Sequence, residues 1–414
     1  MSGRIQAPRG TFDVLPAQAA ERAEVETVVR RVLERAGYGR IETPAFEATE
    51  LFARGVGEST DVVQKEMYTF HDGDFTLRPE GTAPVCRAYV EHGMHKLPQP
   101  VKLWYLSSFY RRERPQAGRF RQFWQVGAEA IGSDDPAVDA ETILLLAQVL
   151  EEIGARGLRL RLSSLGTPET RAAYREELQA HLRSREDELS DDVRSRIELN
   201  PLRAFDTEHR GTQNVMADAP LLIDRLTVED SEHFQEVCGL LDDCELVYDV
   251  DPTLVRGLDY YTRTVFEFTS SELGAQSGVG GGGRYDGLVE MLGGPPTPGC
   301  GWAAGIERIL LASDHPAIAA PPVDLFVAYA GVEHRRPAFA IAAEARRARL
   351  AAQVELAGRS LKGQLRQADR IGARFVAILG EDGTVLRDME SGEQSPVQGS
   401  VVAAVLRGRG GAGL

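Results

Sequence analysis

FYRRERPQAGRFRQFWQVGAEAIG, residues 109–132, is the stretch that decides the fold of this chain. It joins two runs of strand-forming residues, about 101–110 and 120–131, through a Pro- and Gly-containing segment at 115–118. Proline and glycine interrupt strands, so the pattern predicts an antiparallel hairpin. Residues 111–121 hold five arginines and one glutamate. Such a cluster can bind phosphate or carboxylate through forked, charge-assisted hydrogen bonds, although most arginine-rich loops are only solvated.

Composition indicates an ordinary globular protein, with 43% hydrophobic and 26% charged residues, and the 414 residues allow two or three domains. No apolar run approaches the ~20 residues of a membrane span, and the N-terminus lacks a secretory signal, so we expect a cytoplasmic protein without membrane attachment. His92 and His95 have no neighbouring ligand pattern, so we expect helix-surface residues and no protein-held metal. The cysteines, spaced neither for metal nor for disulfides, are Cys86, Cys238, Cys244 and Cys300.

Charge is unevenly divided along the chain. Residues 321–414 carry 13 Lys+Arg and 10 Asp+Glu, a net charge of +3. Because the whole chain has a net charge of −15, residues 1–320 must carry −18. The acidic total argues against a non-specific nucleic-acid coat but permits a local basic patch. A Pro/Ala-rich linker at 315–322 separates the two parts. We therefore predict two domains, 1–320 and 321–414, with different partners.

The predicted first domain mixes strands and helices around the hairpin. Strand signals vanish between about 166 and 243, which predicts a helical insertion there. The turn sequence HDGD at 71–74 predicts a second, smaller hairpin. The other expected elements are helices at 17–36, 83–92 and 136–154, and strands at 41–46, 65–70, 75–78, 158–162, 246–248 and 262–268.

Two glycine-rich blocks follow the insertion. Five of the six residues 278–283 are glycine, which either lets the backbone approach a ligand or leaves a floppy loop. Residues 298–311 read as a Gly-rich strand that leads into a helix, with Arg308 in its first turn. A cation there is slightly unfavourable for the helix dipole, so a bound anion or a salt bridge to a nearby acid would explain it.

The predicted second domain alternates strands with helices. We expect strands at 323–330, 375–379 and 384–388 and helices at 337–350, 361–371 and 400–406. This order is typical of a compact α/β domain with a mixed sheet.

Polar residues stand at the start of the helix predicted at 83–92. Capping alone would explain Thr82, but it explains Glu80 less well, because Pro79 and Gly81 hold that glutamate in place. Several arginines that converge with carboxylates and hydroxyls describe a site for a polyphosphate and a cationic small molecule, and favour attack on a phosphate. The residues that point to this chemistry are Arg111, Arg119, Arg256, Arg308, Glu80, Gln125, Glu129, Tyr261 and Tyr285.

Four blocks, 109–132, 254–268, 281–288 and 301–311, together resemble the histidyl-tRNA synthetases, a family of class II aminoacyl-tRNA synthetases. The resemblance extends over nearly the whole chain. The hairpin is similar to class II motif 2 and the Arg308 helix to motif 3. The sequences RGLDYY and GGGRYDGL resemble two stretches peculiar to the histidine enzymes. The fold implied is an α+β catalytic domain on an antiparallel sheet with flanking helices and a helical insertion, followed by an α/β anticodon-binding domain.

The resemblance also implies roles for individual residues in the reaction of L-histidine, ATP and tRNA(His). Arg256, Arg111 and Arg308 would be the catalytic cations, with Arg256 neutralising the α-phosphate as the histidine carboxylate attacks it. Mg²⁺ would arrive bound to ATP. ATP would be bound by Arg111, Glu113, Arg119, Phe123 and Arg308, and histidine by Glu80, Gly81, Thr82, Arg111, Gln125, Glu129, Arg256, Tyr260, Tyr261 and Tyr285.

Contacts with tRNA are implied at two places. Arg114 and Gln116, at the hairpin tip, would touch the acceptor end, and the choice between ATP and the acceptor end stays open for Arg119. The domain at 321–414 would read the anticodon, with the basic helix at 359–370 as its candidate contact. The family rule also implies a homodimer, with the first helix and strand at its seam.

Two rival functions remain. A catalytically silent paralogue serves as a regulatory subunit of ATP phosphoribosyltransferase. It tends to lack the C-terminal domain and to lose the RGLDYY block, whereas this chain has both. The other rival is a nucleotide-binding interaction module without turnover. Histidine-dependent release of pyrophosphate would exclude both rivals.

Overall fold

The computed structural model describes residues 4–57, 60, 62–274, 277–314 and 322–410. The chain forms two compact units that divide between residues 316 and 317, and each unit is described here by itself. The linker predicted at 315–322 lies outside the described residues except for Pro322.

The predicted hairpin is the centre of the first unit. Strands β5 (Val101–Tyr110) and β6 (Gln122–Ile131) pair antiparallel along their whole length. Gln116 and Arg119 pair across the turn, as the Pro/Gly segment predicted. Alternate side chains of β5 enter different cores, with Trp104 in one and Tyr105 in the other. The sheet around the hairpin therefore has a hydrophobic core on each of its two faces.

An eight-stranded, mainly antiparallel sheet is built outward from this hairpin, in the order β1-β5-β6-β11-β10-β9-β7-β8. Only the two outermost pairs, β1 with β5 and β7 with β8, are parallel. The predicted antiparallel catalytic sheet is confirmed. Its other strands are β1 (Gly39–Arg40), β7 (Leu158–Ser164), β8 (Asp249–Val250), β9 (Thr262–Ser270), β10 (Gly278–Arg284) and β11 (Gly299–Gly305).

The glycine run is an interior strand of this sheet and not a loop. Strand β10 lies between β9 and β11. A Cβ atom on Gly282 would overlap the carbonyl oxygen of Gly301, and one on Gly281 would overlap that of Phe266. The glycines are thus needed because the backbones of three strands come unusually close together.

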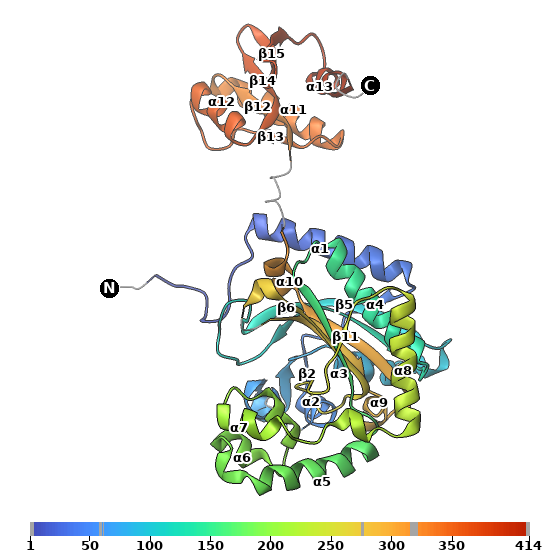
Figure 1. Cartoon of the computed structure of the whole chain (residues 1–414). Coiled ribbons are helices and arrows are strands. Elements are labelled where there is room, and N and C mark those ends of the chain that lie inside the picture. The colour runs from blue at the N-terminus through green and yellow to red at the C-terminus, as the bar shows by residue number, and fades with distance from the viewer. Residues whose placement is uncertain (1–3, 58–59, 61, 275–276, 315–321, 411–414) are drawn as a thin grey trace. The chain divides into compact units, whose positions relative to one another are not determined.

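Helices cover both faces of the sheet (Figure 1). One face packs against α1 (Pro16–Arg35), α4 (Pro136–Glu152), α8 (Val228–Asp243) and α10 (Ile306–Ala312). On the other side lie α2 (Thr49–Val56), α3 (Thr82–Glu91) and α9 (Leu288–Met291), with a small sheet of β2 (Phe46–Ala48), β4 (Phe75–Leu77) and β3 (Tyr68–Phe70).

Two strand predictions are wrong. The strand expected at 41–46 is divided, because residues 41–45 around Pro44 join β1 to β2 without strand geometry. The strand expected at 246–248 begins instead at Asp249. Both errors lie at the edges of sheets, where proline or short length weakens the alternation on which the predictions depend.

Residues 166–243, all of them described, contain helices and no strand. They form α5 (Pro168–Ser184), α6 (Asp191–Arg196), α7 (Arg210–Met216), α8 and the short 3-10 helices η4 (Glu186–Glu188), η5 (Pro201–Asp206) and η6 (Leu222–Arg225).

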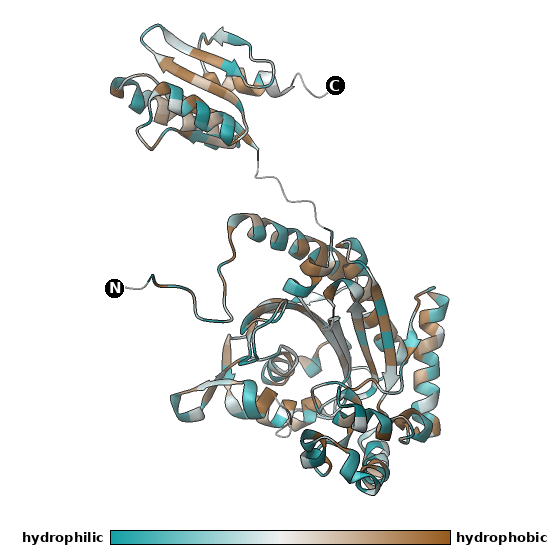
Figure 2. Ribbon diagram, turned by 60° about the vertical axis from the view of Figure 1, so that its left-hand side comes forward, coloured by the Kyte–Doolittle hydropathy of each residue, from teal (hydrophilic) through white to brown (hydrophobic). Residues whose placement is uncertain are grey.

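The second unit has a five-stranded sheet in the order β13-β12-β14-β15-β16. The first three strands are parallel and the last two pairings antiparallel, so the predicted mixed sheet is confirmed. Figure 2 shows hydrophobic central strands and hydrophilic residues along the helices. The strands are β12 (Val323–Tyr329), β13 (Ala352–Val354), β14 (Ala373–Gly380), β15 (Gly383–Asp388) and β16 (Gln394–Pro396), and the helices α11 (Arg335–Arg347), α12 (Leu361–Arg370) and α13 (Val401–Gly410).

Candidate active site

A cavity of about 780 Å³ opens in the first unit, against the sheet. Its walls come from the start of α3, both arms of the hairpin, the segment before β9, strands β10 and β11, and the start of α10. Segments as far apart in sequence as Val62 and Arg308 therefore meet there. Of the residues predicted for the site, it is lined by Glu80, Gly81, Thr82, Arg111, Glu113, Arg119, Phe123, Gln125, Arg256, Tyr260, Tyr261 and Arg308.

Glu129 and Tyr285 lie behind the cavity lining. The Glu129 carboxyl group is fully buried, and it accepts hydrogen bonds from the hydroxyls of Thr82 (2.8 Å), Tyr285 (2.7 Å) and Tyr105 (3.4 Å). Burial raises the pKa of Glu129 to about 8, although these hydroxyls oppose the rise. The group therefore carries a proton at neutral pH in the free protein, and Thr82 connects it to the cavity.

Glu80 and Thr82 exchange the roles that the sequence suggested. The Glu80 carboxylate accepts from the backbone N–H groups of Thr82 (2.7 Å) and Ala83 (3.0 Å), so Glu80 caps α3. The Thr82 hydroxyl points instead to Glu129. The longer glutamate can fold back onto the free N–H groups of the first turn, which the sequence prediction did not consider. Burial raises the pKa of Glu80 despite these bonds.

Arg256 is held in the wall of the cavity by Glu267. Its Nη1 lies 2.9 Å from Glu267 Oε1, and Glu267 Oε2 is 3.4 Å from Arg161 Nη1. Within the described part of the chain, Arg256 Nε and Gln125 Oε1 are buried with no hydrogen-bond partner. A buried donor and a buried acceptor without partners cost free energy unless a ligand or water satisfies them. These two atoms mark the cavity as a polar binding site.

The base of the hairpin forms one wall of the cavity. Arg111 Nε donates to the carbonyl oxygen of Pro79 (2.9 Å), and its guanidinium carbon lies 5.4 Å from the centre of the Phe123 ring. Glu113 stands between Arg111 and Arg119, at 3.6 Å and 3.3 Å. An aromatic face beside a row of cations suits a planar base that carries phosphates.

Arg308 donates from Nε to the carbonyl oxygen of Gly278. Burial lowers its pKa, and the nearby Arg119 lowers it further. Its neighbour Glu307 is engaged elsewhere, by Arg22 Nη2 at 2.6 Å and the backbone N–H of Trp124 at 3.1 Å. Two arginines that face the same cavity would be stabilised by an anionic ligand.

Arg114 and Gln116 are not part of the cavity lining. Both are exposed at the tip of the hairpin. The structure therefore separates these two residues from the predicted site residues that line the cavity.

The sequence prediction missed several residues of the site. Tyr105 donates to Glu129, and its ring fills the space above Gly81 and Gly127, where a Cβ atom would overlap it. Folding residues 101–131 symmetrically about the turn places Tyr105 opposite Gly127, so this pair could have been found. Glu267 could not be predicted, because the sequence does not show which acid pairs with Arg256. Arg203 and Asp206, which also line the cavity, come from the insertion and carry no sequence signal.

No group of three or more His, Cys, Asp or Glu side chains among the described residues could hold a metal ion. The four cysteines are free thiols. None of the helices in the described ranges has the length and apolar character needed to cross a membrane.

Comparisons with known proteins agree with this geometry. The family model for histidyl-tRNA synthetase matches residues 10–309, and the model for the anticodon binding domain matches residues 324–409. The histidine–tRNA ligase of Desulfitobacterium hafniense is 48% identical over 402 residues, which cover 94% of this chain and 95% of that protein. The histidine–tRNA ligase of Streptomyces avermitilis is 47% identical and covers 98% and 99%.

Among solved structures, the apo histidyl-tRNA synthetase of S. aureus superposes with a TM-score of 0.80 at 35% identity, covering 98% of this chain and 99% of that one. Sequence, fold and site geometry thus agree over the catalytic and the C-terminal unit, and the chain belongs to the histidyl-tRNA synthetase family.

Proposed function

We propose that the chain is a histidine–tRNA ligase that works in two steps. A carboxylate oxygen of L-histidine attacks the α-phosphorus of ATP, the bond to the β-phosphate breaks, and histidyl-adenylate and pyrophosphate form. A ribose hydroxyl at the 3′ end of tRNA(His) then attacks the acyl carbon, and AMP leaves. The observation that carries the proposal is the buried Glu129–Tyr285–Thr82 cluster at the floor of an arginine-lined cavity.

The histidine pocket would lie over Glu129. The side chains of Glu129, Tyr261 and Tyr285 suit an imidazole, because its two nitrogens need one donor and one acceptor. Gln125 Oε1, which lacks a partner among the described residues, is free to accept from the α-amino group of histidine. Glu80 and Thr82 would support it from the start of α3. The remaining members of the proposed pocket are Gly81, Tyr260, Arg111 and Arg256.

ATP would occupy the arginine-rich end of the cavity. Phe123 would stack under the adenine, Arg111 and Glu113 would bind the base and the α-phosphate, and Arg308 would bind the γ-phosphate. Arg119 shares the cavity with Arg308 and contacts Glu113, which favours ATP over tRNA as its partner. Mg²⁺ would enter bound to the phosphates of ATP and would neutralise part of their charge.

Arg256 would stabilise the transition state. Glu267 fixes one side of its guanidinium group, while its Nε remains available for the charge that develops on the α-phosphate. A donor that is already oriented costs no reorganisation when the reaction occurs.

Binding of tRNA would involve both units. The exposed Arg114 and Gln116 would reach the acceptor end, and residues 321–414, which include the anticodon-binding match, would read the anticodon. We also propose that the protein is a cytoplasmic homodimer. Phe46, Phe70 and Phe75 are 51%, 43% and 37% exposed and pack against one another on the small sheet, and Phe46 ends the segment 41–46 that is expected at the dimer seam.

The regulatory-subunit alternative is not favoured. The chain retains the RGLDYY sequence, of which all residues but Asp259 line the cavity, and a C-terminal unit that matches the anticodon binding domain. The deciding experiment is ATP–pyrophosphate exchange with each standard amino acid in turn. Exchange with histidine alone is expected, and exchange with none or with a different amino acid would reject the proposal.

A further inference from the structure

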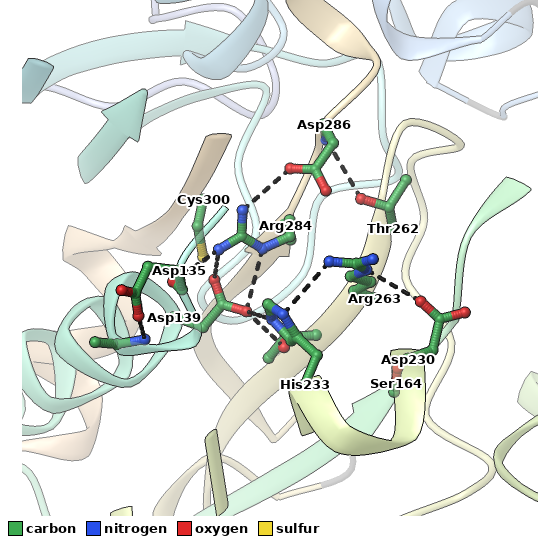
Figure 3. Close-up of polar contacts among 12 residues, drawn as sticks. Asp135, Asp139, Ser164, Asp230, His233, Thr262, Arg263, Arg284, Asp286 and Cys300 are labelled. Atoms are coloured by element: carbon green, nitrogen blue, oxygen red, sulfur yellow. Dashed lines mark hydrogen bonds and ion pairs between the residues drawn. The ribbon is translucent and has the colours of Figure 1, made fainter. Parts of the chain in front are cut away.

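A buried network of charges lies within the first unit, at the end of β10, one residue before Tyr285. Asp139 of α4 and Arg284 of β10 are both 0% exposed, and Asp139 Oδ1 lies 2.6 Å from Arg284 Nη2 (Figure 3). A fully buried ion pair adds little net stability, because removing both charges from water costs about as much as their attraction returns. Its presence here therefore calls for another role.

The donors around Asp139 leave it fully ionised and fixed. Its Oδ2 accepts from His233 Nε2 and from the Thr264 hydroxyl, both at 2.7 Å, and from Arg284 Nε at 3.2 Å. The other ring nitrogen of His233 faces Nη1 of Arg263 at 3.5 Å, and a guanidinium group can only donate. His233 therefore donates from Nε2 to the Asp139 carboxylate, and Arg284 supplies the opposite charge.

Arg284 connects this network to the backbone around Tyr285. Its Nη1 contacts Asp286 Oδ1 at 3.2 Å and also donates to the carbonyl oxygen of Ser133 at 2.9 Å. Asp286 Oδ1 accepts in turn from the backbone N–H of Gly299 at 3.2 Å. The residues before and after Tyr285 are thus both attached to fixed neighbours.

Tyr285 is held through its backbone, its ring and its hydroxyl. Its backbone N–H donates to Gly299 O at 2.7 Å, and its ring lies where a Cβ atom of Gly299 would be. Its hydroxyl donates to Glu129 Oε2 at 2.7 Å. Arg284 and Asp286 contact each other, whereas the hydroxyl between them in sequence contacts Glu129, so the two neighbours of Tyr285 are tied together while its side chain reaches the pocket.

We propose that Arg284, fixed by Asp139 and paired with Asp286, is a positioning residue that holds Tyr285 against Glu129 and thereby sets the affinity for histidine. The inference rests on the proposed function of the Glu129 pocket. It assigns to the buried network a role in selecting the amino acid, distinct from the binding of ATP.

A double-mutant cycle tests this role through the pyrophosphate-exchange assay. The variants are Asp286→Asn, Arg284→Lys and Tyr285→Phe, singly and with each of the first two combined with the third. Tyr285→Phe is expected to raise KM for histidine about tenfold, the value of one hydrogen bond to a charged or polar group. Asp286→Asn and Arg284→Lys should each raise it several-fold and leave KM for ATP unchanged.

The combined variants distinguish positioning from general stability. If Arg284 acts through Tyr285, neither double variant should be worse than Tyr285→Phe alone, because residues that share one function are not additive. Multiplying effects, or an equal rise in KM for ATP, would overturn the inference. Asp286 is partly exposed, and Asp286→Asn keeps the side-chain volume. If Arg284→Lys fails to fold, the Asp286→Asn variants therefore test the positioning role.

Tyr174→Phe is the matched control. It removes a buried hydroxyl that donates to Pro220 O at 2.8 Å in the insertion, and should leave both KM values unchanged. The two levels of the proposal fail differently. An unchanged KM for histidine in Tyr285→Phe would reject the pocket itself, and with it the positioning role, whereas a histidine effect in Tyr285→Phe with additive doubles would reject only the role of Arg284.

Discussion

Glu129 combines two properties that rarely occur together, since its carboxyl group is fully buried yet faces three hydroxyls and no cation among its hydrogen-bond partners. In that environment the neutral form is favoured until the pH approaches the raised pKa of about 8. The residue can therefore hold or release a proton when an imidazole binds, which an exposed glutamate could not do near neutral pH. The proposed specificity for histidine therefore depends on this residue most directly.

The free energy of unfolding should reveal this proton. The pKa of Glu129 is raised from an ordinary 4.5 to about 8 in the folded protein. The folded state therefore binds more protons than the unfolded state between these values, and this group's contribution falls as the pH rises through the window. We expect the stability of the wild type relative to Glu129→Gln to fall by at most about 1.4 kcal/mol per pH unit from pH 5 to pH 8. Urea unfolding at several pH values measures it, and a difference that does not vary with pH would contradict the assignment.

Replacing Arg256 tests the transition-state role. Arg256→Ala removes an oriented cation from the cavity wall and should raise the barrier to adenylate formation by about 3 kcal/mol, roughly a hundredfold in rate. Single-turnover formation of histidyl-adenylate is the measurement. Arg159→Ala is the control, because Arg159 lies on the same sheet but pairs with Asp249 outside the cavity. An unchanged rate in Arg256→Ala would show that its role is only to pair with Glu267.

At the scale of elements, the sequence predicts those helices and strands that a local pattern of residues determines. The hairpin strands, α4 and the mixed sheet of the second unit follow from alternation, helical periodicity and turn residues. Strands β13 and β16 were missed, because three residues are too few to show an alternation. The glycine run of β10 was ambiguous for another reason. Its strand geometry depends on β9 and β11, which no local pattern reveals.

Strand β10 should tolerate no side chain at its centre. Gly282→Ala would place a methyl group against the carbonyl oxygen of Gly301 and within 2.6 Å of the Trp302 Cα atom. Backbone on that side cannot move without separating β10 from β11, so we expect a loss of more than about 3 kcal/mol. Urea unfolding measures the effect. Gly39→Ala on β1 is the matched control, since its nearest atom would be 3.9 Å away, and it should change stability by less than about 1 kcal/mol.

At the scale of the whole molecule, the site could be predicted only in part. Several arginines lie in motifs whose folding does not require a cation, and these arginines predicted an anion-binding site. The family resemblance then implied a role for each of them. The link from Glu129 to Tyr285, 156 residues later, depends on the meeting of β6, β11 and β10, which sequence spacing does not contain. The cap formed by Glu80 depends likewise on a side-chain conformation that residue type does not determine. Contacts between distant strands were therefore the part that only coordinates could supply.

The division into two units predicts that the two steps of the reaction can be separated. All of the cavity lining lies within residues 62–308, and the second unit has its own apolar cores. A protein that ends after residue 322 should therefore form histidyl-adenylate at close to the wild-type rate, but charge tRNA(His) at least tenfold more slowly, because the anticodon contacts are lost. Pyrophosphate exchange and aminoacylation, measured on the same preparation, separate the two effects. Full charging by the shortened protein would show that the second unit does not read the anticodon, and loss of exchange would show that the first unit needs the second for its activity.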